Sequence, residues 1–423
     1  MGCGSSQNAQ APGRTGGSAG DDEDFGGVRR KYDKKSGKAV VCDGGKDDDG
    51  REDDFFEVEE AEGEQFMAVR PWIGQIEEPD NHNERNDDVP DVTYALEYVY
   101  GYRAADSRQN VYWNSAGQAV YMTAALGVIL DPASNTQKFF GGGEVENTAK
   151  NVANDQAHHT DDIMCIAINR ARDTAVSGQV GSRPTIFAWD AVTGEKKQRI
   201  KIAKGARGIK AIAINAEGMI AAADLHNDHH LYVFDASGNQ VLKQKGGPDA
   251  IYDIAWDERA GSTRLMTGGK KHLYFWDASA ADGDKRKGLF GSNDATNFQC
   301  VAWDESGNAY SGGSNGKVYI WNPEDRTCTG TIDVCKGFLS SVRFANGKLW
   351  AGGKDGRVSC IDTSSNSASV VQEFNAVVRA IDVDDSGNMV VGCKDGSIYG
   401  INGSDKMQIM ASHCEGEVWG LAQ

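Results

Sequence analysis

One pattern of β-rich runs and polar turns recurs six times along this chain and constrains its fold most strongly. In residues 297–322 (NFQCVAWDESGNAYSGGSNGKVYIWN), two β-rich runs flank the turn DESGN and a third run follows the turn SNG. The other copies span 338–362, 377–402 and, more loosely, 163–190, 209–235 and 251–277. The residues that end the third run are 45, 42, 45, 40 and 40 positions apart. This period predicts a repeat architecture in which each unit buries its faces against its neighbours.

The end of the third run indicates the type of repeat. The aligned positions, with the aspartates that follow three of them, are Trp189, Asp190, Phe234, Asp235, Trp276, Asp277, Trp321, Ile361 and Ile401. Trp-Asp endings at this period are the signature of WD40 β-propellers. The Asn-Gly and Asp-Gly pairs at 315–316, 355–356 and 395–396 favour type I′ turns, in which both central residues have positive φ.

A further strand-rich segment precedes these copies. Residues 91–134 contain β-rich runs around a turn at 114–117, and they make seven blades with the six copies. The last eleven residues, HCEGEVWGLAQ, look like the opening strand of another blade, which either closes the ring or begins the continuation of a longer protein. The sequence therefore predicts an all-β fold, a seven-bladed WD40 β-propeller with a disordered N-terminal tail.

The chain changes character near residue 64. Residues 1–63 are mainly Gly, Ser, Asp, Glu and Lys, and they contain too little apolar surface to offset the entropy lost on folding. This tail shows no heptad pattern, so a coiled coil is not indicated. We expect residues 64–158 to contribute propeller strands and residues 159–423 to hold the WD40 repeats, the last of them incomplete.

Charge and cysteine content restrict the class of protein. The 44 basic and 62 acidic side chains give a net charge of −18, which argues against a nucleic-acid partner held by an overall basic field. No apolar run is long enough for a membrane-spanning helix. The nine cysteines are odd in number and form no CxxC pair, as expected for free thiols in a reducing compartment. We expect a cytoplasmic protein.

The first six residues suggest lipidation. Met1-Gly2-Cys3-Gly4-Ser5-Ser6 fits the pattern for myristoylation of Gly2, and Cys3 is placed for palmitoylation. Stable anchoring needs a second acyl chain or a basic patch, and residues 29–38 carry a local excess of positive charge. The alternative is that Gly, Ser and Cys are simply what a disordered start contains, and that the basic cluster is solvated charge.

Two basic stretches are candidates for binding an acidic partner. They consist of Lys196, Lys197, Arg199, Lys201, Lys204, Arg207 and Lys210, and of Lys285, Arg286 and Lys287. Solvated faces are the default interpretation of such stretches, but these are the best local patches on an otherwise acidic chain.

No catalytic, metal or cofactor site is predicted. His226, His229 and His230 crowd one loop with two aspartates but match no known ligand spacing, so we interpret the loop as polar and metal-free. His159 and its neighbours resemble the polar entry of a WD blade that ties strands together. No nucleophile–base pair or carboxylate dyad stands out, although propellers as a fold can host catalysis.

One stretch carries a more specific resemblance. LEYVYGYRAADSRQNVYWNSAGQAVYMTAALGVIL resembles the HELP motif of the echinoderm microtubule-associated-protein-like (EMAP-like) family, and VYGYR is its most specific part. FMAVRP (66–71) is similar to the entry that precedes this motif. HTDDIMCIAIN, SGQV, LHNDHHLYVFD, GGKKHLYFWD, KGLFG and GEVWGLA are similar to successive blades of the family, in the same order.

The resemblance implies a non-catalytic protein of the microtubule cytoskeleton. Family members bind tubulin, many belong to cilia and axonemes, and a second propeller usually begins about where this chain ends. Tubulin, microtubules or axonemal proteins are therefore the expected partners, and the cytoskeleton, including the cilium or axoneme, is the expected location. The alternative is a membrane-tethered WD40 scaffold, held by acylation of Gly2 and Cys3, that recruits other proteins.

Overall fold

The computed structural model divides the chain into two units, residues 1–52 and 53–423, which are described separately. The described residues are 23–25, 28–32 and 39–41 (backbone only), 95–142, 157–181, 184–202, 205–293 and 295–412. In the first unit, β1 (Glu23–Phe25), β2 (Val28–Tyr32) and β3 (Ala39–Val41) form an antiparallel sheet in the order β1-β2-β3. Short strands thus occur where the sequence predicts disorder. The remainder of 1–63 lies outside the described residues, so the prediction for the tail stays a prediction.

The second unit contains seven four-stranded antiparallel sheets, here called blades 1 to 7. Blade 1 contains β4 (Val111–Trp113), β5 (Ala119–Thr123), β6 (Leu126–Asp131) and β7 (Thr136–Phe140). Blade 2 contains β8 (Ile163–Ile168), β9 (Thr174–Gln179), β10 (Thr185–Asp190) and β11 (Lys196–Lys201). Blade 3 contains β12 (Ile209–Ile214), β13 (Ile220–Asp224), β14 (His230–Phe234) and β15 (Gln240–Lys245). Blade 4 contains β16 (Ile251–Trp256), β17 (Arg264–Gly269), β18 (His272–Asp277) and β19 (Arg286–Lys287).

The last three blades follow the same order. Blade 5 contains β20 (Phe298–Trp303), β21 (Ala309–Gly313), β22 (Lys317–Asn322) and β23 (Thr327–Asp333). Blade 6 contains β24 (Leu339–Ala345), β25 (Lys348–Gly353), β26 (Arg357–Asp362) and β27 (Ser367–Glu373). Blade 7 contains β28 (Val378–Val383), β29 (Met389–Cys393), β30 (Ile398–Asn402) and β31 (Asp405–Met410).

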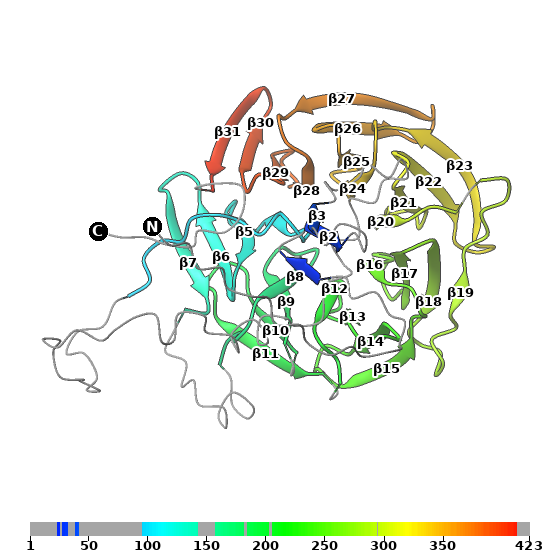
Figure 1. Ribbon diagram of the computed structural model, residues 1–423, viewed down its shortest axis with the longest axis horizontal. Helices are drawn as coiled ribbons and strands as arrows, with labels where there is room; N and C mark the ends of the chain where they lie inside the picture. The colour runs from blue at the N-terminus through cyan, green and yellow to red at the C-terminus, as the bar shows by residue number, and fades with distance from the viewer. Residues whose placement is uncertain are drawn as a thin grey trace, which may run out of the picture. The chain divides into compact units, whose positions relative to one another are not determined.

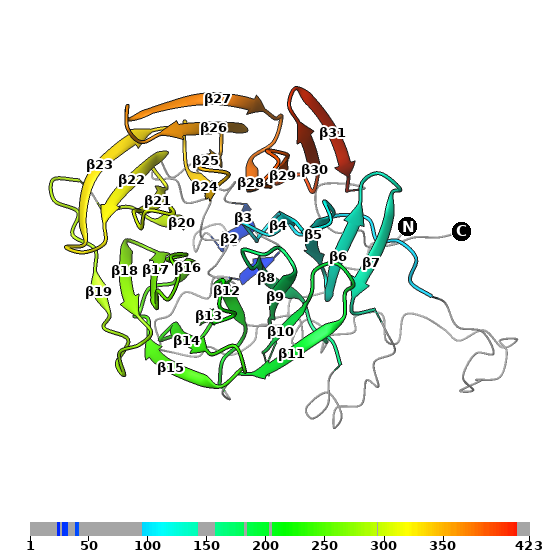
Figure 2. The same ribbon diagram turned by 180° about the vertical axis from the view of Figure 1, so that it is seen from behind.

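The blades surround a common axis, with the first strand of each blade innermost and the fourth outermost (Figures 1 and 2). Neighbouring inner strands pack on one another around the ring, and β28 packs on β4 to close it. The predicted seven-bladed, all-β propeller is therefore confirmed. No helix in the described part of the chain is long and apolar enough to cross a membrane. Residues 413–423, the predicted opening strand of a further blade, lie outside the described residues.

The aromatic and aliphatic repeat positions lie on the third strands and fill the spaces between blades. The aspartates Asp190, Asp235 and Asp277 instead accept backbone N–H groups of the turns that follow. Trp189, for example, is fully buried among residues of blades 1 and 2. Its indole Nε1 donates to the Ser177 hydroxyl at 3.0 Å, and Trp276 and Trp321 make the same kind of bond to a Thr or Ser of their own second strands. A Cβ on Gly127 would lie 2.6 Å from the Trp189 ring, so this glycine permits the close approach of the two blades.

The turns before the third strands differ from the type I′ prediction. Gly316, Gly356 and Gly396 have positive φ, but the residues before them do not. In each turn the glycine N–H instead donates to a carbonyl three residues back, as in Gly316 N to Gly313 O at 3.1 Å. The turn is therefore one residue longer than a type I′ hairpin, and only the glycine needs the left-handed conformation.

A buried ion pair joins the two ends of the ring. Arg172, in the turn after β8 of blade 2, contacts the carboxylate of Asp382 in blade 7 at 2.5 Å and donates to the Val383 carbonyl at 2.6 Å. The Arg172 guanidinium also donates to the Trp113 carbonyl of blade 1 at 2.9 Å. The Trp113 N–H in turn donates to Asp382 at 3.0 Å. The side chain of Asp382 has no solvent exposure. These bonds tie blade 7 to blades 1 and 2.

We expect Arg172→Ala to lower the free energy of unfolding by about 3 kcal/mol, because it leaves the buried Asp382 carboxylate without its main counter-charge. Urea denaturation followed by tryptophan fluorescence measures this change. Arg170→Ala is the matched control, because Arg170 pairs with Glu305 at 2.9 Å and both side chains are more than half exposed. The control should cost less than about 1 kcal/mol. Equal losses in the two variants would show that the Arg172 pair does not hold the ring together.

Candidate functional site

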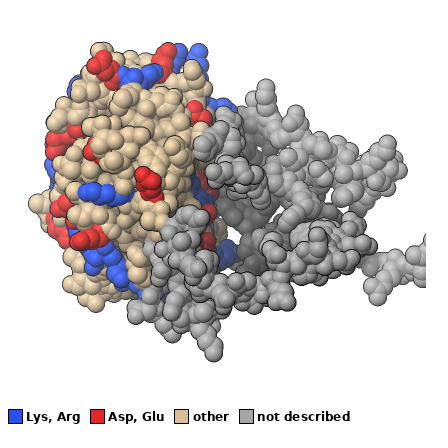
Figure 3. All heavy atoms as spheres, turned by 90° about the vertical axis from the view of Figure 1, so that its left-hand side faces the viewer, with Lys and Arg blue, Asp and Glu red and all other residues tan. Residues whose placement is uncertain are grey.

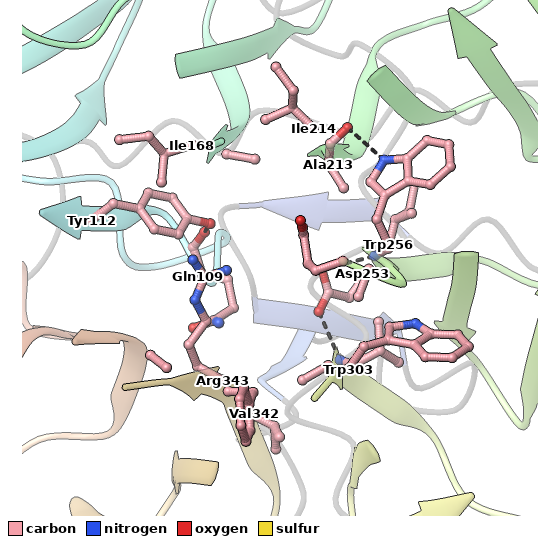
Figure 4. A pocket seen from close by; sticks show the side chains of 18 of the residues that line it. Gln109, Tyr112, Ile168, Ala213, Ile214, Asp253, Trp256, Trp303, Val342 and Arg343 are labelled. Carbon is pink, nitrogen blue, oxygen red and sulfur yellow. Dashed lines mark hydrogen bonds between the residues drawn. The ribbon is translucent and has the colours of Figure 1, made fainter. Parts of the chain in front are cut away.

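The inner strands surround a cavity of about 200 Å³ on the propeller axis. Figure 4 shows side chains from several blades around it, among them Tyr112, Asp253, Trp256, Trp303 and Arg343. Asp253 Oδ2 accepts the N–H of Val301 in the next blade at 2.9 Å. The cavity wall is thus polar as well as aromatic, and it is made by residues that also connect the blades.

The segment before β4 lies across the axial space between the inner strands, which we call the channel. Ser107 donates to the Met164 carbonyl of blade 2 at 2.9 Å. Arg108 is bonded to Gln299 of blade 5 and lies 5.3 Å from the centre of the Tyr252 ring in blade 4. The Gln109 side-chain oxygen accepts the Ser341 hydroxyl of blade 6 at 2.5 Å and the Ile381 N–H of blade 7 at 3.2 Å. Residues 107–109 therefore contact the inner strands of five other blades.

Burial shifts the pKa values of several groups in the channel. Loss of solvent raises the pKa of Asp253 to about 7, against the opposing effect of its two backbone N–H donors. Burial likewise raises the pKa of Glu258 to about 7. It also raises the pKa of the Cys165 thiol, which therefore stays protonated and unreactive at neutral pH. The arrangement is that of a buried polar junction between blades.

His159 has a similar structural setting at the start of blade 2. Its ring nitrogens bond Gln179 at 2.8 Å and Ser177 at 2.7 Å, and Ser177 also receives the bond from Trp189. Burial lowers the pKa of His159 to about 4, so the ring is neutral near pH 7. These contacts join the entry of the blade to its second and third strands.

A second candidate site lies on the outer strands of blades 2, 3 and 4. The outer strands β11, β15 and β19 contain no acidic residue. We call the basic residues on and directly beside them the basic rim: Lys196, Lys197, Arg199, Lys201, Lys243, Lys245, Lys285, Arg286 and Lys287. The outer strands of the other four blades and the positions directly beside them hold only Lys138, Arg326 and Lys406 as basic residues. Positive charge is therefore concentrated on three consecutive blades.

Part of the basic rim is already paired. Lys197 contacts Asp190 at 3.2 Å, Lys245 contacts Asp228 at 2.8 Å, and Arg286 contacts Asp284 at 2.6 Å. Lys285 donates to the Gly246 carbonyl at 2.5 Å, and burial lowers its pKa. The side chains of Lys196, Lys201, Lys243 and Lys287 are exposed. Figure 3 shows one side of the propeller, where basic and acidic side chains are interspersed over the surface.

The structure unites the two predicted basic stretches and adds to them. Lys243 and Lys245 of blade 3 lie between them on the ring, and neither was among the predicted basic residues. The two form only a short Lys-Gln-Lys run in the sequence, but this pair occupies the same fourth-strand position in its repeat as residues 196–201.

Three predicted basic residues do not belong with the basic rim as described. Lys210 lies on the inner strand β12, buried, with its ammonium 4.8 Å from the Tyr252 ring centre, and burial lowers its pKa strongly. Arg207 precedes β12 and donates to the Leu225 carbonyl at 2.9 Å and to Asn227 at 2.7 Å. Lys204 lies outside the described residues, as do the lipidation candidates Gly2 and Cys3.

The raised pKa of Asp253 predicts a pH dependence of stability. The folded protein holds this proton up to about pH 7, whereas the unfolded chain releases it near pH 4, so the stabilisation from this group falls as pH rises through that window. Because Asp253→Asn removes the titration, wild type should gain stability relative to the variant when pH is lowered from 8 to 5. Urea denaturation at several pH values measures this difference.

Asp235→Asn is the control for this experiment. The hydrogen bond from Asn239 lowers the pKa of this turn carboxylate, so its ionisation does not change between pH 5 and 8. The difference between wild type and the control should stay flat over this range. If the Asp253→Asn difference were equally flat, the carboxylate would be ionised throughout, contrary to the expectation.

Comparison with known proteins places this architecture in a family. The model of the first β-propeller of echinoderm microtubule-associated protein matches residues 156–401, and the HELP motif model matches residues 89–128. The HELP match includes residues 107–109, which cross the channel.

Similar proteins include a ciliary WD repeat-containing protein, ctxp80, from Euplotoides octocarinatus, which is 46% identical over 94% of this chain and 56% of its own length. Echinoderm microtubule-associated protein-like 2 from Mus musculus is 27% identical over 87% of this chain and 57% of its own length. Echinoderm microtubule-associated protein-like 1 from Homo sapiens is 26% identical over 87% of this chain and 46% of its own length. The chain thus spans about half the length of these relatives. With its HELP motif and seven-bladed propeller, it belongs to the EMAP-like family.

Proposed function

We propose that this protein is a non-catalytic microtubule-associated propeller that binds tubulin or a tubulin-based lattice through the basic rim. The observation that carries the proposal is the concentration of positive charge on the outer strands of blades 2, 3 and 4 in a chain of net charge −18. The names of the similar proteins supply the partner class, since they refer to microtubules and to cilia.

The position of the basic rim suits contact with a large acidic partner such as tubulin. Outer strands have no further strand of their own blade beyond them, so long basic side chains there can reach a neighbouring surface. Val241 and Leu289, 47% and 49% exposed, lie beside these charges and add apolar area. Attraction between a basic patch and an acidic surface speeds association and weakens with salt. The net negative charge of the chain would oppose binding through most other faces.

Co-pelleting of the full chain with stabilised microtubules across a salt series tests the proposal. We expect saturable binding that weakens as salt rises. The double variant Lys201→Glu/Lys243→Glu reverses two exposed charges on blades 2 and 3 and should weaken binding at least about tenfold at low salt, through lost attraction and new repulsion.

The matched control is Lys336→Glu/Lys348→Glu, which makes the same change of charge at two exposed positions outside the basic rim. This control should bind nearly as well as wild type. Equal weakening by both double variants would mean that only total charge matters, and the basic rim would not be the binding surface. Failure of the wild-type chain to pellet even at low salt would overturn direct binding to plain microtubules.

We propose the cytoplasmic cytoskeleton, including the cilium or axoneme, as the location of the protein. The name of the ciliary relative supports this proposal. A chain that binds a tubulin lattice would concentrate wherever that lattice is dense, as it is in an axoneme.

A second, compatible proposal concerns the membrane. The Met-Gly-Cys start favours myristoylation at Gly2 and palmitoylation at Cys3, which would tether the propeller as a scaffold for other proteins. Gly2→Ala should abolish acyl incorporation and move the protein from the membrane to the soluble fraction in a flotation experiment. Ala9→Gly, a change of the same size beyond the motif, is the control. If Gly2→Ala and wild type partitioned alike, the tether would be excluded.

A further inference from the structure

The loop between β13 and β14 of blade 3 gathers two imidazoles and a carboxylate that the proposed function does not use. His226 and Asp228 lie in this loop, and His230 is the first residue of β14. The loop turns tightly, with the His229 N–H donating to the His226 carbonyl at 2.8 Å. This turn brings the side chains of residues 226, 228 and 230 to one side of the loop, and the His226 and His230 ring centres are 4.7 Å apart.

The donor atoms of these three side chains are close enough to share one metal ion. His226 Nδ1 and His230 Nε2 each lie 4.0 Å from Asp228 Oδ2, and the three donor atoms lie within 4.8 Å of one another. Bonds of about 2 Å from each donor to a zinc ion place ligands somewhat more than 3 Å apart. His226 and Asp228 are 38% and 40% exposed, so rotations of these two side chains can close that difference while His230 stays in place.

A buried carboxylate orients one of the imidazoles. Asp224, whose side chain has no solvent exposure, accepts a hydrogen bond from the ring Nδ1–H of His230 at 3.2 Å. It also accepts the Tyr232 hydroxyl at 3.0 Å and the His230 backbone N–H at 2.8 Å. With its Nδ1 proton engaged, His230 presents the Nε2 lone pair toward Asp228. Such a carboxylate–histidine pair is the usual support of a metal-ligating histidine.

We propose that His226, Asp228 and His230 form a binding site for a divalent transition-metal ion of the zinc class. Two imidazole nitrogens and one carboxylate oxygen are donors that zinc accepts, and three protein ligands leave a fourth position for water or a partner group. In the structure the Asp228 N–H donates a hydrogen bond to His226 Nδ1 at 3.1 Å, and metal binding replaces this bond. The ion also competes with the Lys245 ammonium for Asp228 Oδ2. Metal binding therefore releases one lysine of the basic rim.

These residues match no ligand spacing of a known metal motif, so the sequence alone does not predict a metal site here. On an extended strand, residues at i, i+2 and i+4 share one face, but the first and last of them lie about 13 Å apart, too far to share an ion. Here His226 and Asp228 lie in a turn instead. The turn places residues at i, i+2 and i+4 together, which the linear spacing alone does not reveal.

Isothermal titration of the full chain with Zn²⁺ in the presence of a reductant tests the proposal, with the ligand-field spectrum of bound Co²⁺ as a second readout. Wild type should bind one more ion than His226→Ala, and that ion should be removed by EDTA. The Co²⁺ spectrum of this ion should indicate nitrogen and oxygen ligands without sulfur. Asp224→Asn should weaken its binding by about 10-fold to 100-fold, because it loosens the orientation of His230.

His158→Ala is the matched control, because His158 is a partly exposed histidine outside the loop. It should retain the wild-type stoichiometry and Co²⁺ spectrum. His226 is 38% exposed, so its replacement by Ala should leave the fold intact, and circular dichroism verifies this. Equal stoichiometry and spectra for wild type and His226→Ala would overturn the site. So would a Co²⁺ spectrum dominated by thiolate, which would assign the bound ion to cysteines.

Discussion

The carboxylate of Asp382 is the point at which the ring becomes a closed structure. It lies in blade 7 without solvent exposure, receives the guanidinium of Arg172 from blade 2 and the backbone N–H of Trp113 from blade 1, and lies 3.4 Å from Arg343 of blade 6. A buried carboxylate is costly unless such partners surround it, so its environment requires four blades to be in place together. The contacts of blade 7 with blades 1 and 2 depend on this closure.

Closure also explains where the charges of the chain can act. Inner strands must satisfy their polar groups inside the channel, as Asp253 does with the N–H of Val301. Water can hydrate the polar side chains of outer strands, and on blades 2, 3 and 4 these strands present basic side chains to solvent. The same residue type therefore has two fates: Lys210 on an inner strand is buried, whereas Lys201 and Lys243 are exposed. The net charge of the whole chain gives no indication of this separation.

The repeat period made the fold predictable from the sequence, because equivalent residues in each blade pack against the neighbouring blade in the same way. The third-strand positions, such as Trp189, lie between the blades as the pattern implies. The sites were harder to predict. Lys243 and Lys245 look isolated until blade 3 is set beside blades 2 and 4, and the grouping of His226 with Asp228 and His230 depends on one turn. Aligning the fourth strands of the repeats would have grouped the lysines, whereas the histidine cluster depends on a turn geometry that residue spacing does not encode.

The crossing of the channel by residues 107–109 has a consequence for how the chain reaches its native state. These residues come before the first blade, yet their partners include Gln299, Ser341 and Ile381, which lie 191 to 272 positions further along the chain. Contacts of such high sequence separation slow folding, because the intervening chain must be ordered before they form. During synthesis, residues 107–109 cannot complete their hydrogen bonds until blade 7 has left the ribosome. This part of the HELP motif is therefore synthesised before the blades but is among the last parts of the propeller to form its native contacts.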